Sequence, residues 1–154
     1  MKLFVSLCFS LLLISTFTIN AETFDPEKFA NDYFNAWSAT QSPSATKQDV
    51  EHYLSFLTDD VGHQHYPYDS DDTRAEDGKN AMRKGMTYYL GAHTKYSSEL
   101  ISYSFDYNVV VIKYSSMSSG VHPQTKQEMS INDTTLEVLE LEDGKVSLVR
   151  KYSD

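Results

Sequence analysis

A single change of hydrophobic period divides the chain. Up to about residue 91 the apolar residues recur at helical spacing in three segments, whereas from residue 99 onward they recur as in strands. The later segments are ELISYSF, NVVVIKYSSMS, EMSINDTTLEVLEL and KVSLVRKYS, with DYN and EDG marking turns between neighbours. Helices followed by four consecutive strands predict an α+β domain, in which an antiparallel sheet curls around three helices and encloses a pocket.

Three helices are expected in the first half. Asp25-Pro26-Glu27 has the form of a helix start, and the first helix should run from about Pro26 to Thr40. The second should end near Thr58, and its apolar stripe consists of Val50, Tyr53, Leu54 and Leu57. The third should run from around Gly78 to a C-cap at Gly91, with one face made of Met82, Met86, Tyr89 and Leu90.

The stretch DDVGHQHYPYDSDD, residues 59–72, concentrates histidine, tyrosine and aspartate between the second and third helices. We expect Asp59 and Asp60 to form the turn that ends the second helix. Val61 to Tyr66 has no helical period and predicts a short strand. Pro67 should end that strand, and we expect a solvated acidic loop from Asp69 to Asp77.

The first 21 residues resemble a signal peptide, with one lysine, a short apolar run and a small residue at Ala21. The only cysteine, Cys8, lies in this leader. We therefore expect an exported protein, periplasmic or secreted and without a membrane anchor, that consists of a single domain over residues 22–154. The formal net charge is −9 and no Lys/Arg cluster occurs, so nucleic acid is a poor partner.

Three stretches carry a resemblance to a known family. DVEHYLSFLTDDV, EDGKNAMRKGM and TTLEVLELEDGKVSLVRKYSD resemble the second helix, the glycine-led third helix and the closing hairpin of the nuclear-transport-factor-2-like superfamily. This superfamily includes SnoaL-like polyketide cyclases, ketosteroid isomerase and scytalone dehydratase. The resemblance implies a cone-shaped SnoaL-like fold and leaves the function open, because the superfamily contains enzymes, binding proteins and assembly modules.

The resemblance also implies candidate catalytic residues. Counting from Asp60 places His65 at the position of the proton-shuttling base in ketosteroid isomerases. Counting back from Gly144 places Glu137 at the oxyanion-hole acid, and Tyr33 is the counterpart of the first-helix tyrosine. The family has aspartate where this chain has His65 and Glu137, so the resemblance implies a related isomerase, cyclase or dehydratase rather than a steroid isomerase. Imidazole and a protonated carboxyl can both serve such cofactor-independent acid–base chemistry.

Three further residues are expected to contact a small, largely apolar ligand, namely His63, Trp37 and Asp133. His93 follows the third helix and is not expected to face the pocket mouth. We find no nucleophile or phosphate-loop motif, and we expect no cofactor.

Two alternatives remain open. An H-x-H pair on a strand points both imidazoles to one face, so His63 and His65 could bind a metal with His93, Asp69 or Glu137 as a third ligand; our prediction is that no metal binds. The chain could also be a non-enzymatic ligand-binding module or a homodimer. Its sheet faces would then pack together through Val109 to Ile112 and Leu136 to Leu141.

Overall fold

The computed structural model describes residues 24–153; the expected leader lies outside the described residues. Three helices and a five-stranded sheet follow in the predicted order. The helices are α1 (Pro26–Gln41), α2 (Lys47–Leu54) and α3 (Gly78–Tyr89). The strands are β1 (Leu57–Tyr66), β2 (His93–Asp106), β3 (Val109–Val121), β4 (Glu128–Glu142) and β5 (Lys145–Ser153).

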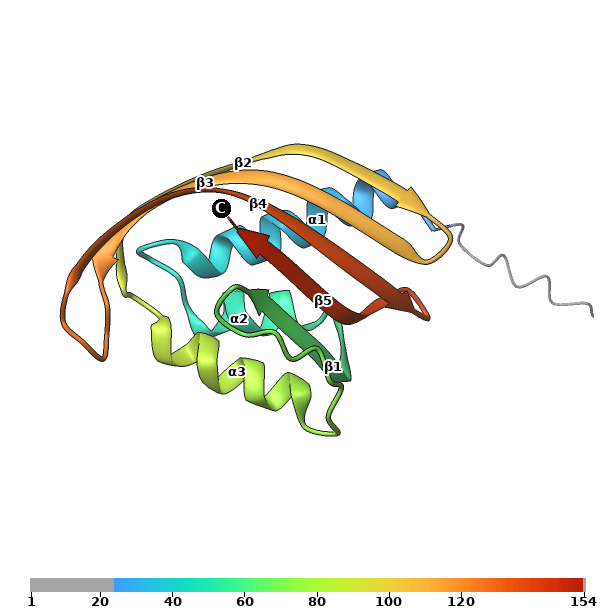
Figure 1. Ribbon diagram of the computed structural model, residues 1–154, viewed down its shortest axis with the longest axis horizontal. Coiled ribbons are helices and arrows are strands. Elements are labelled where there is room, and N and C mark those ends of the chain that lie inside the picture. The colour runs from blue at the N-terminus through green and yellow to red at the C-terminus, as the bar shows by residue number, and fades with distance from the viewer. Residues whose placement is uncertain (1–23, 154) are drawn as a thin grey trace, which may run out of the picture.

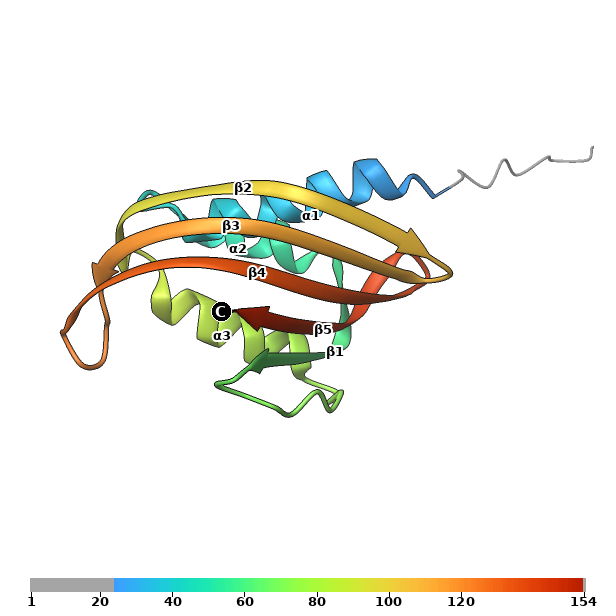
Figure 2. The same ribbon diagram turned by 45° about the horizontal axis from the view of Figure 1, so that its top comes forward.

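The sheet is curved, and the helices lie against its concave side (Figure 1). The strand order is β1-β5-β4-β3-β2, with the β1–β5 pair parallel and the other pairs antiparallel. The α1 helix runs beneath the long strands, whereas α3 lies beside β1 (Figures 1 and 2). This arrangement confirms the predicted α+β fold with a mainly antiparallel curled sheet.

Local signals fix the ends of the helices. The Asp25 side chain accepts a hydrogen bond from the backbone N–H of Lys28, 3.0 Å away, and Pro26 occupies the first turn of α1. Thr46 and Asp49 form a reciprocal capping box at the start of α2. Gly91, just past α3, adopts φ +75°, as the predicted C-cap requires.

The boundary between α2 and β1 was predicted wrongly. The helix ends at Leu54 rather than near Thr58, and Leu57 begins the strand, where it pairs with Val146 and is fully buried. Asp59 and Asp60 therefore lie within β1 instead of forming a turn. The physical reason is non-local: β5, far along the chain, hydrogen-bonds this segment, and the N–H of Val146 donates to the carbonyl of Phe56 (2.8 Å).

The predicted strands of the second half are present; β2, β3 and β4 are longer than expected, and β5 has the expected bounds. The β2–β3 and β4–β5 hairpins turn at Tyr107 and at Asp143-Gly144, and all three residues have positive φ, typical of tight hairpin turns. β3 and β4 continue past the helices as a hairpin that curls down on the side of α3 (Figure 1).

The core lies between the concave face of the sheet and the helices. Every second residue of β3 and β4 faces inward, and the buried set includes Val110, Ile112, Tyr114, Thr135, Glu137 and Leu139. Helices α1 and α2 add Tyr33, Phe34, Tyr53 and Leu54. Among the described residues, Glu137 is the only buried one with a charged side chain. Across residues 24–153, no helix has the length and apolar character that a membrane span requires.

Candidate functional site

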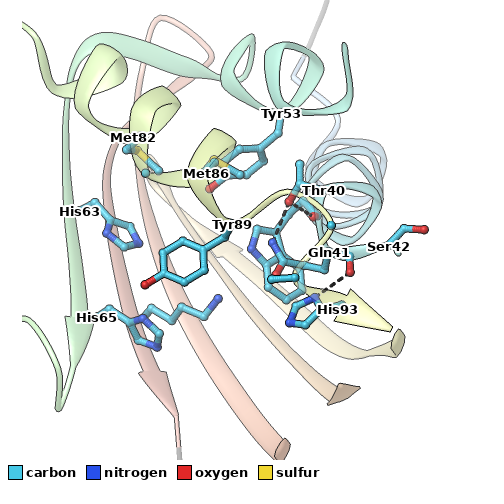
Figure 3. Close-up of a pocket in the computed structure, with 15 residues that line it drawn as sticks. Thr40, Gln41, Ser42, Tyr53, His63, His65, Met82, Met86, Tyr89 and His93 are labelled. Carbon is cyan, nitrogen blue, oxygen red and sulfur yellow. Dashed lines mark hydrogen bonds between the residues drawn. The ribbon is translucent and has the colours of Figure 1, made fainter. Parts of the chain in front are cut away.

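A pocket of ≈ 430 Å³ opens at one end of the concave face, within the size range of small-molecule sites. It lies between the end of α1, the inner face of α3 and the strands β1 and β5 (Figure 3). Its apolar wall includes Trp37, Met82, Met86 and Tyr89, and its polar wall includes Thr40, Tyr53, His63, His65, His93 and Lys151. The pocket therefore combines aromatic and thioether surface with a few convergent polar groups.

Lys151 is the cation of this pocket. Its side chain is 12% exposed, and its Nζ lies 3.1 Å from Oε1 of Glu137. The same ammonium lies 4.2 Å from the centre of the Trp37 ring, within cation–π range. An ammonium group has three N–H donors. After the contacts to Glu137 and Trp37, donor capacity remains for a bound molecule.

Behind Lys151, the buried carboxylate of Glu137 collects further donors. The Tyr114 hydroxyl donates to Oε1 at 2.7 Å and the Tyr33 hydroxyl donates to Oε2 at 3.3 Å. The hydroxyls of Tyr33 and Tyr53 are 3.0 Å apart, so the network reaches the pocket wall at Tyr53. Burial, followed by the charge of Glu137, raises the pKa of Tyr53 and of Tyr114 well above the usual range, and burial also raises the pKa of Tyr33. These hydroxyls therefore remain protonated donors at neutral pH.

His63 and His65 lie on the same face of β1, with ring centres 6.3 Å apart (Figure 3). The Cα of His65 pairs in register with that of Lys151 on β5. Burial and the neighbouring ammonium of Lys151 lower the pKa of His63, and the same causes with the charge of His63 lower the pKa of His65 to about 4. Both imidazoles are therefore neutral at pH 7, and each offers one donor and one acceptor nitrogen.

His93 also lines the pocket, contrary to the expectation from its position after α3. Its Nδ1 lies 2.8 Å from the carbonyl oxygen of Gln41, and its ring stacks on Tyr96. A carbonyl oxygen can only accept, so Nδ1 carries the hydrogen. The other ring nitrogen of a neutral His93 is then an acceptor held in a fixed orientation.

The structure brings some of the sequence-predicted residues together and separates others. His63, His65 and Trp37 line the pocket. Tyr33 and Glu137 lie beneath the pocket surface and connect to it through Tyr53 and Lys151. Asp133 lies further along β4, opposite Ser116, and outside the residues that line the pocket.

Lys151 is the site residue that sequence reasoning missed. One signal could have identified it: residues alternate along β5, so Lys151 shares the inward face with the buried Val149. A lysine at an inward position needs a buried partner of opposite charge. The same argument applies to Glu137, which occupies an inward position of β4, the preceding strand. Among the described residues, no group of three or more His, Cys, Asp or Glu side chains is placed to hold a metal ion.

Comparison with known proteins shows which solved structures share the fold. No family model and no curated protein sequence matches the chain significantly. Solved structures do match. A protein from Shewanella denitrificans, provisionally assigned as a SnoaL-like polyketide cyclase, has a TM-score of 0.64 at 10% identity over 84% of this chain and 90% of its own.

Two other structures with no assigned function are also similar. A nuclear-transport-factor-2-like protein from Exiguobacterium has a TM-score of 0.62 at 11% identity, covering 82% of this chain and 98% of its own. A cystatin-fold protein from Novosphingobium aromaticivorans has a TM-score of 0.60 at 17% identity, covering 84% of this chain and 98% of its own. The chain thus has the nuclear-transport-factor-2-like, SnoaL-like fold, and at these identities the likeness establishes the fold alone.

Proposed function

We propose that the pocket binds a small, largely apolar molecule with an oxygen-bearing group and catalyses cofactor-independent proton transfer on it, as an isomerase, cyclase or dehydratase. The observation that carries this proposal is the placement of one ammonium group, Lys151, beside two neutral imidazoles, His63 and His65, in an otherwise aromatic and methionine-lined pocket. Three structural neighbours carry a provisional assignment as polyketide cyclases, which supports a proposal of this class of chemistry.

In the proposed reaction, the carbonyl oxygen of the ligand accepts a hydrogen bond from the ammonium of Lys151. The unprotonated nitrogen of His65 removes a proton from the carbon next to that carbonyl, and the electron pair of the broken C–H bond moves onto the oxygen. An imidazolium beside Lys151 is unfavourable, so His65 is a weak base for the first transfer and a ready donor in the second, and the stabilisation of the oxygen by Lys151 must drive the first transfer. Return to another carbon gives isomerisation, and transfer to a departing hydroxyl gives dehydration.

Glu137 and Tyr33 support this chemistry from beneath the pocket. The carboxylate of Glu137 balances the charge of Lys151 and fixes its Nζ by the 3.1 Å contact. A positioned ammonium stabilises negative charge on the reacting oxygen without reorganisation during the reaction. The catalytic group that touches the ligand oxygen is thus Lys151, and Glu137 with Tyr33 positions it.

The test begins with native mass spectrometry of the protein purified from its own host, to identify a retained ligand. Turnover and binding of that ligand are then measured in His65→Ala and Lys151→Met. His52→Ala and Lys113→Met serve as matched controls, because both residues are exposed and lie outside the pocket. Unchanged turnover in the two pocket variants would overturn the catalytic proposal.

A non-enzymatic carrier or a homodimer of the same fold is the second candidate. Lys113, Leu136 and Tyr152 are direct cross-strand neighbours on the convex face of the sheet, and Leu136 and Tyr152 are each 39% exposed. Such apolar side chains on an uncovered sheet face favour pairing with a second copy. Because side chains alternate along a strand, Val110 and Ile112 point into the core and cannot contribute to that dimer face.

We also propose that the protein is exported, because residues 1–21 have the composition of a signal peptide. The measurement is the N-terminal residue of the protein recovered from culture medium or periplasm. Recovery of the intact N-terminus from the cytoplasm alone would contradict export.

A further inference from the structure

A second, smaller hollow of ≈ 150 Å³ adjoins the pocket under the β3–β4 hairpin. We name it the hairpin groove; its lining comprises Tyr89, Ala92, His93, Ser118, Gly120, Val121, His122, Pro123, Met129 and Ile131. Three of these residues, Tyr89, Ala92 and His93, also line the pocket. The two hollows are therefore neighbours that meet at one short segment of the chain.

The hairpin is fixed to the pocket by backbone contacts. Val121 donates its N–H to the carbonyl of Ala92 at 3.0 Å, and Gly120 pairs in register with His93. A Cβ at position 120 would lie 2.1 Å from that carbonyl oxygen, so only glycine permits this approach. The hairpin groove is thus held at a constant position relative to the pocket.

Tyr89 stands at the junction of the two hollows. Its ring packs edge-on against His122 of the hairpin, with ring centres 5.8 Å apart. Figure 3 shows the same side chain reaching across the pocket from α3 toward the strand that carries His63 and His65. Tyr89 is half exposed, so its ring lies at the surface between the two hollows rather than in the packed core.

Apolar side chains of the groove are open to solvent. Val121, Met129 and Ile131 are 41%, 42% and 38% exposed, and Met129 and Ile131 share the concave face of the sheet with the core residues of β4. An exposed apolar surface that continues from a ligand pocket offers burial to a part of the ligand that the pocket does not hold.

We propose that the ligand is elongated and amphipathic: its oxygen-bearing head lies at Lys151, and an unbranched hydrocarbon tail passes Tyr89 into the hairpin groove. This inference rests on the proposed small-molecule function of the pocket and specifies its ligand class. The shared lining of the two hollows at Tyr89, Ala92 and His93 supports it, because a molecule whose head lies in the pocket can extend its tail past these residues into the groove.

The test uses straight-chain carboxylic acids, from hexanoic to hexadecanoic, and the matching primary alcohols, all below their micelle concentrations. Trp37 is the only tryptophan of the chain and lies under Lys151 in the pocket, so its fluorescence reports on occupancy of the head site. We expect affinity for the acids to rise about fourfold for each methylene that becomes buried, which corresponds to ~0.8 kcal/mol. Lys151→Met should weaken the acids more than the alcohols.

Variants in the groove locate the tail. Met129→Gln with Ile131→Thr should leave hexanoic acid binding unchanged and weaken the long acids by roughly tenfold or more, because two apolar contacts are lost. Met117→Gln is the matched control: Met117 is an exposed methionine of the same hairpin, outside the groove. It should leave the affinity for every chain length unchanged.

Each other outcome counts against the inference in a distinguishable way. If short acids bind and added methylenes do not raise the affinity, the ligand has no tail in the groove, and the proposed function of the pocket is unaffected. A groove variant that changes sedimentation but not the dependence on chain length shows that a second copy of the chain covers the groove. Failure of every acid and alcohol to change Trp37 fluorescence contradicts both the tail and the proposed oxygen-headed ligand.

Discussion

Replacing Lys151 by methionine tests the buried charge network directly. Methionine keeps much of the length and apolar surface of lysine and removes its charge. Glu137, which is 2% exposed, would lose the counter-ion 3.1 Å away and keep only the hydroxyl donors of Tyr114 and Tyr33. Loss of one partner of a buried ion pair costs about 3–5 kcal/mol. Because the two hydroxyls continue to donate, we expect about 3 kcal/mol.

The assay is urea denaturation at pH 7, together with thermal unfolding. A loss of about 3 kcal/mol should lower the midpoint temperature by roughly 10 °C for a domain of this size. The double variant Glu137→Gln with Lys151→Met removes both charges, so it should recover most of the lost free energy of unfolding. Lys113→Met, on the exposed outer face, should change stability by less than about 0.5 kcal/mol.

Two results would refute this reasoning. Lys151→Met could prove as stable as the wild type, which would mean that water or another cation satisfies Glu137. The double variant could also be less stable than the single one. The hydroxyl contacts of Tyr33 and Tyr114 would then depend on the carboxylate itself, and the lysine would contribute little.

Three further predictions concern the pocket helix, the histidines and the outer face. Gly85 lies in the middle of α3 with open space where a Cβ would be, so Gly85→Ala should raise the free energy of unfolding by about 1 kcal/mol. Gly78→Ala should lower it, because the new Cβ would lie 2.2 Å from the carbonyl oxygen of Val61. Denaturant titration compares the two variants, and a loss of stability in Gly85→Ala would contradict the open space. The pKa of His65 is about 4 in the folded protein against 6.5 for an unperturbed histidine, so the unfolded chain binds more protons between these two pH values. The free energy of unfolding should therefore be retained above pH 6.5 and fall as the pH decreases toward 4. Urea titrations at several pH values should show a flatter dependence for His65→Gln. If the outer face forms a dimer, Leu136→Lys should yield monomers by analytical ultracentrifugation, and an unchanged mass would argue against that face.

The fold was largely predictable because most of its elements depend on local sequence. The cap at Asp25, the glycine after α3 and the turn at Asp143-Gly144 lie next to the segments that they end or connect. The end of α2 was not predictable in this way. Leu57 fits the helical stripe by spacing, yet it belongs to a strand because β5 pairs with it from the far end of the chain.

The site was predictable in part for the same reason. His63 and His65 share a strand face, which alternation reveals. The sequence around Glu137 does not indicate its partner, because Lys151 lies on the neighbouring strand. The largely buried charge of Lys151 is stabilised by its contacts with Trp37 and Glu137. Alternation along β5 indicates that Lys151 points inward, whereas pairing it with Glu137 also requires the register of β4 against β5.

The parallel pairing of β1 with β5 has a consequence for the order of folding. β1 is an edge strand whose sole neighbour in the sheet is β5, the last strand of the described chain. The helices and the β2–β4 meander can form from contacts close in sequence, whereas the β1–β5 pair must close a loop that contains α3 and the whole β2–β4 meander, which is slow. His65 and Lys151 face each other in register only once that closure is complete. The binding wall is then the latest part of the described sheet to form, so ligand binding reports on molecules in which the sheet is complete.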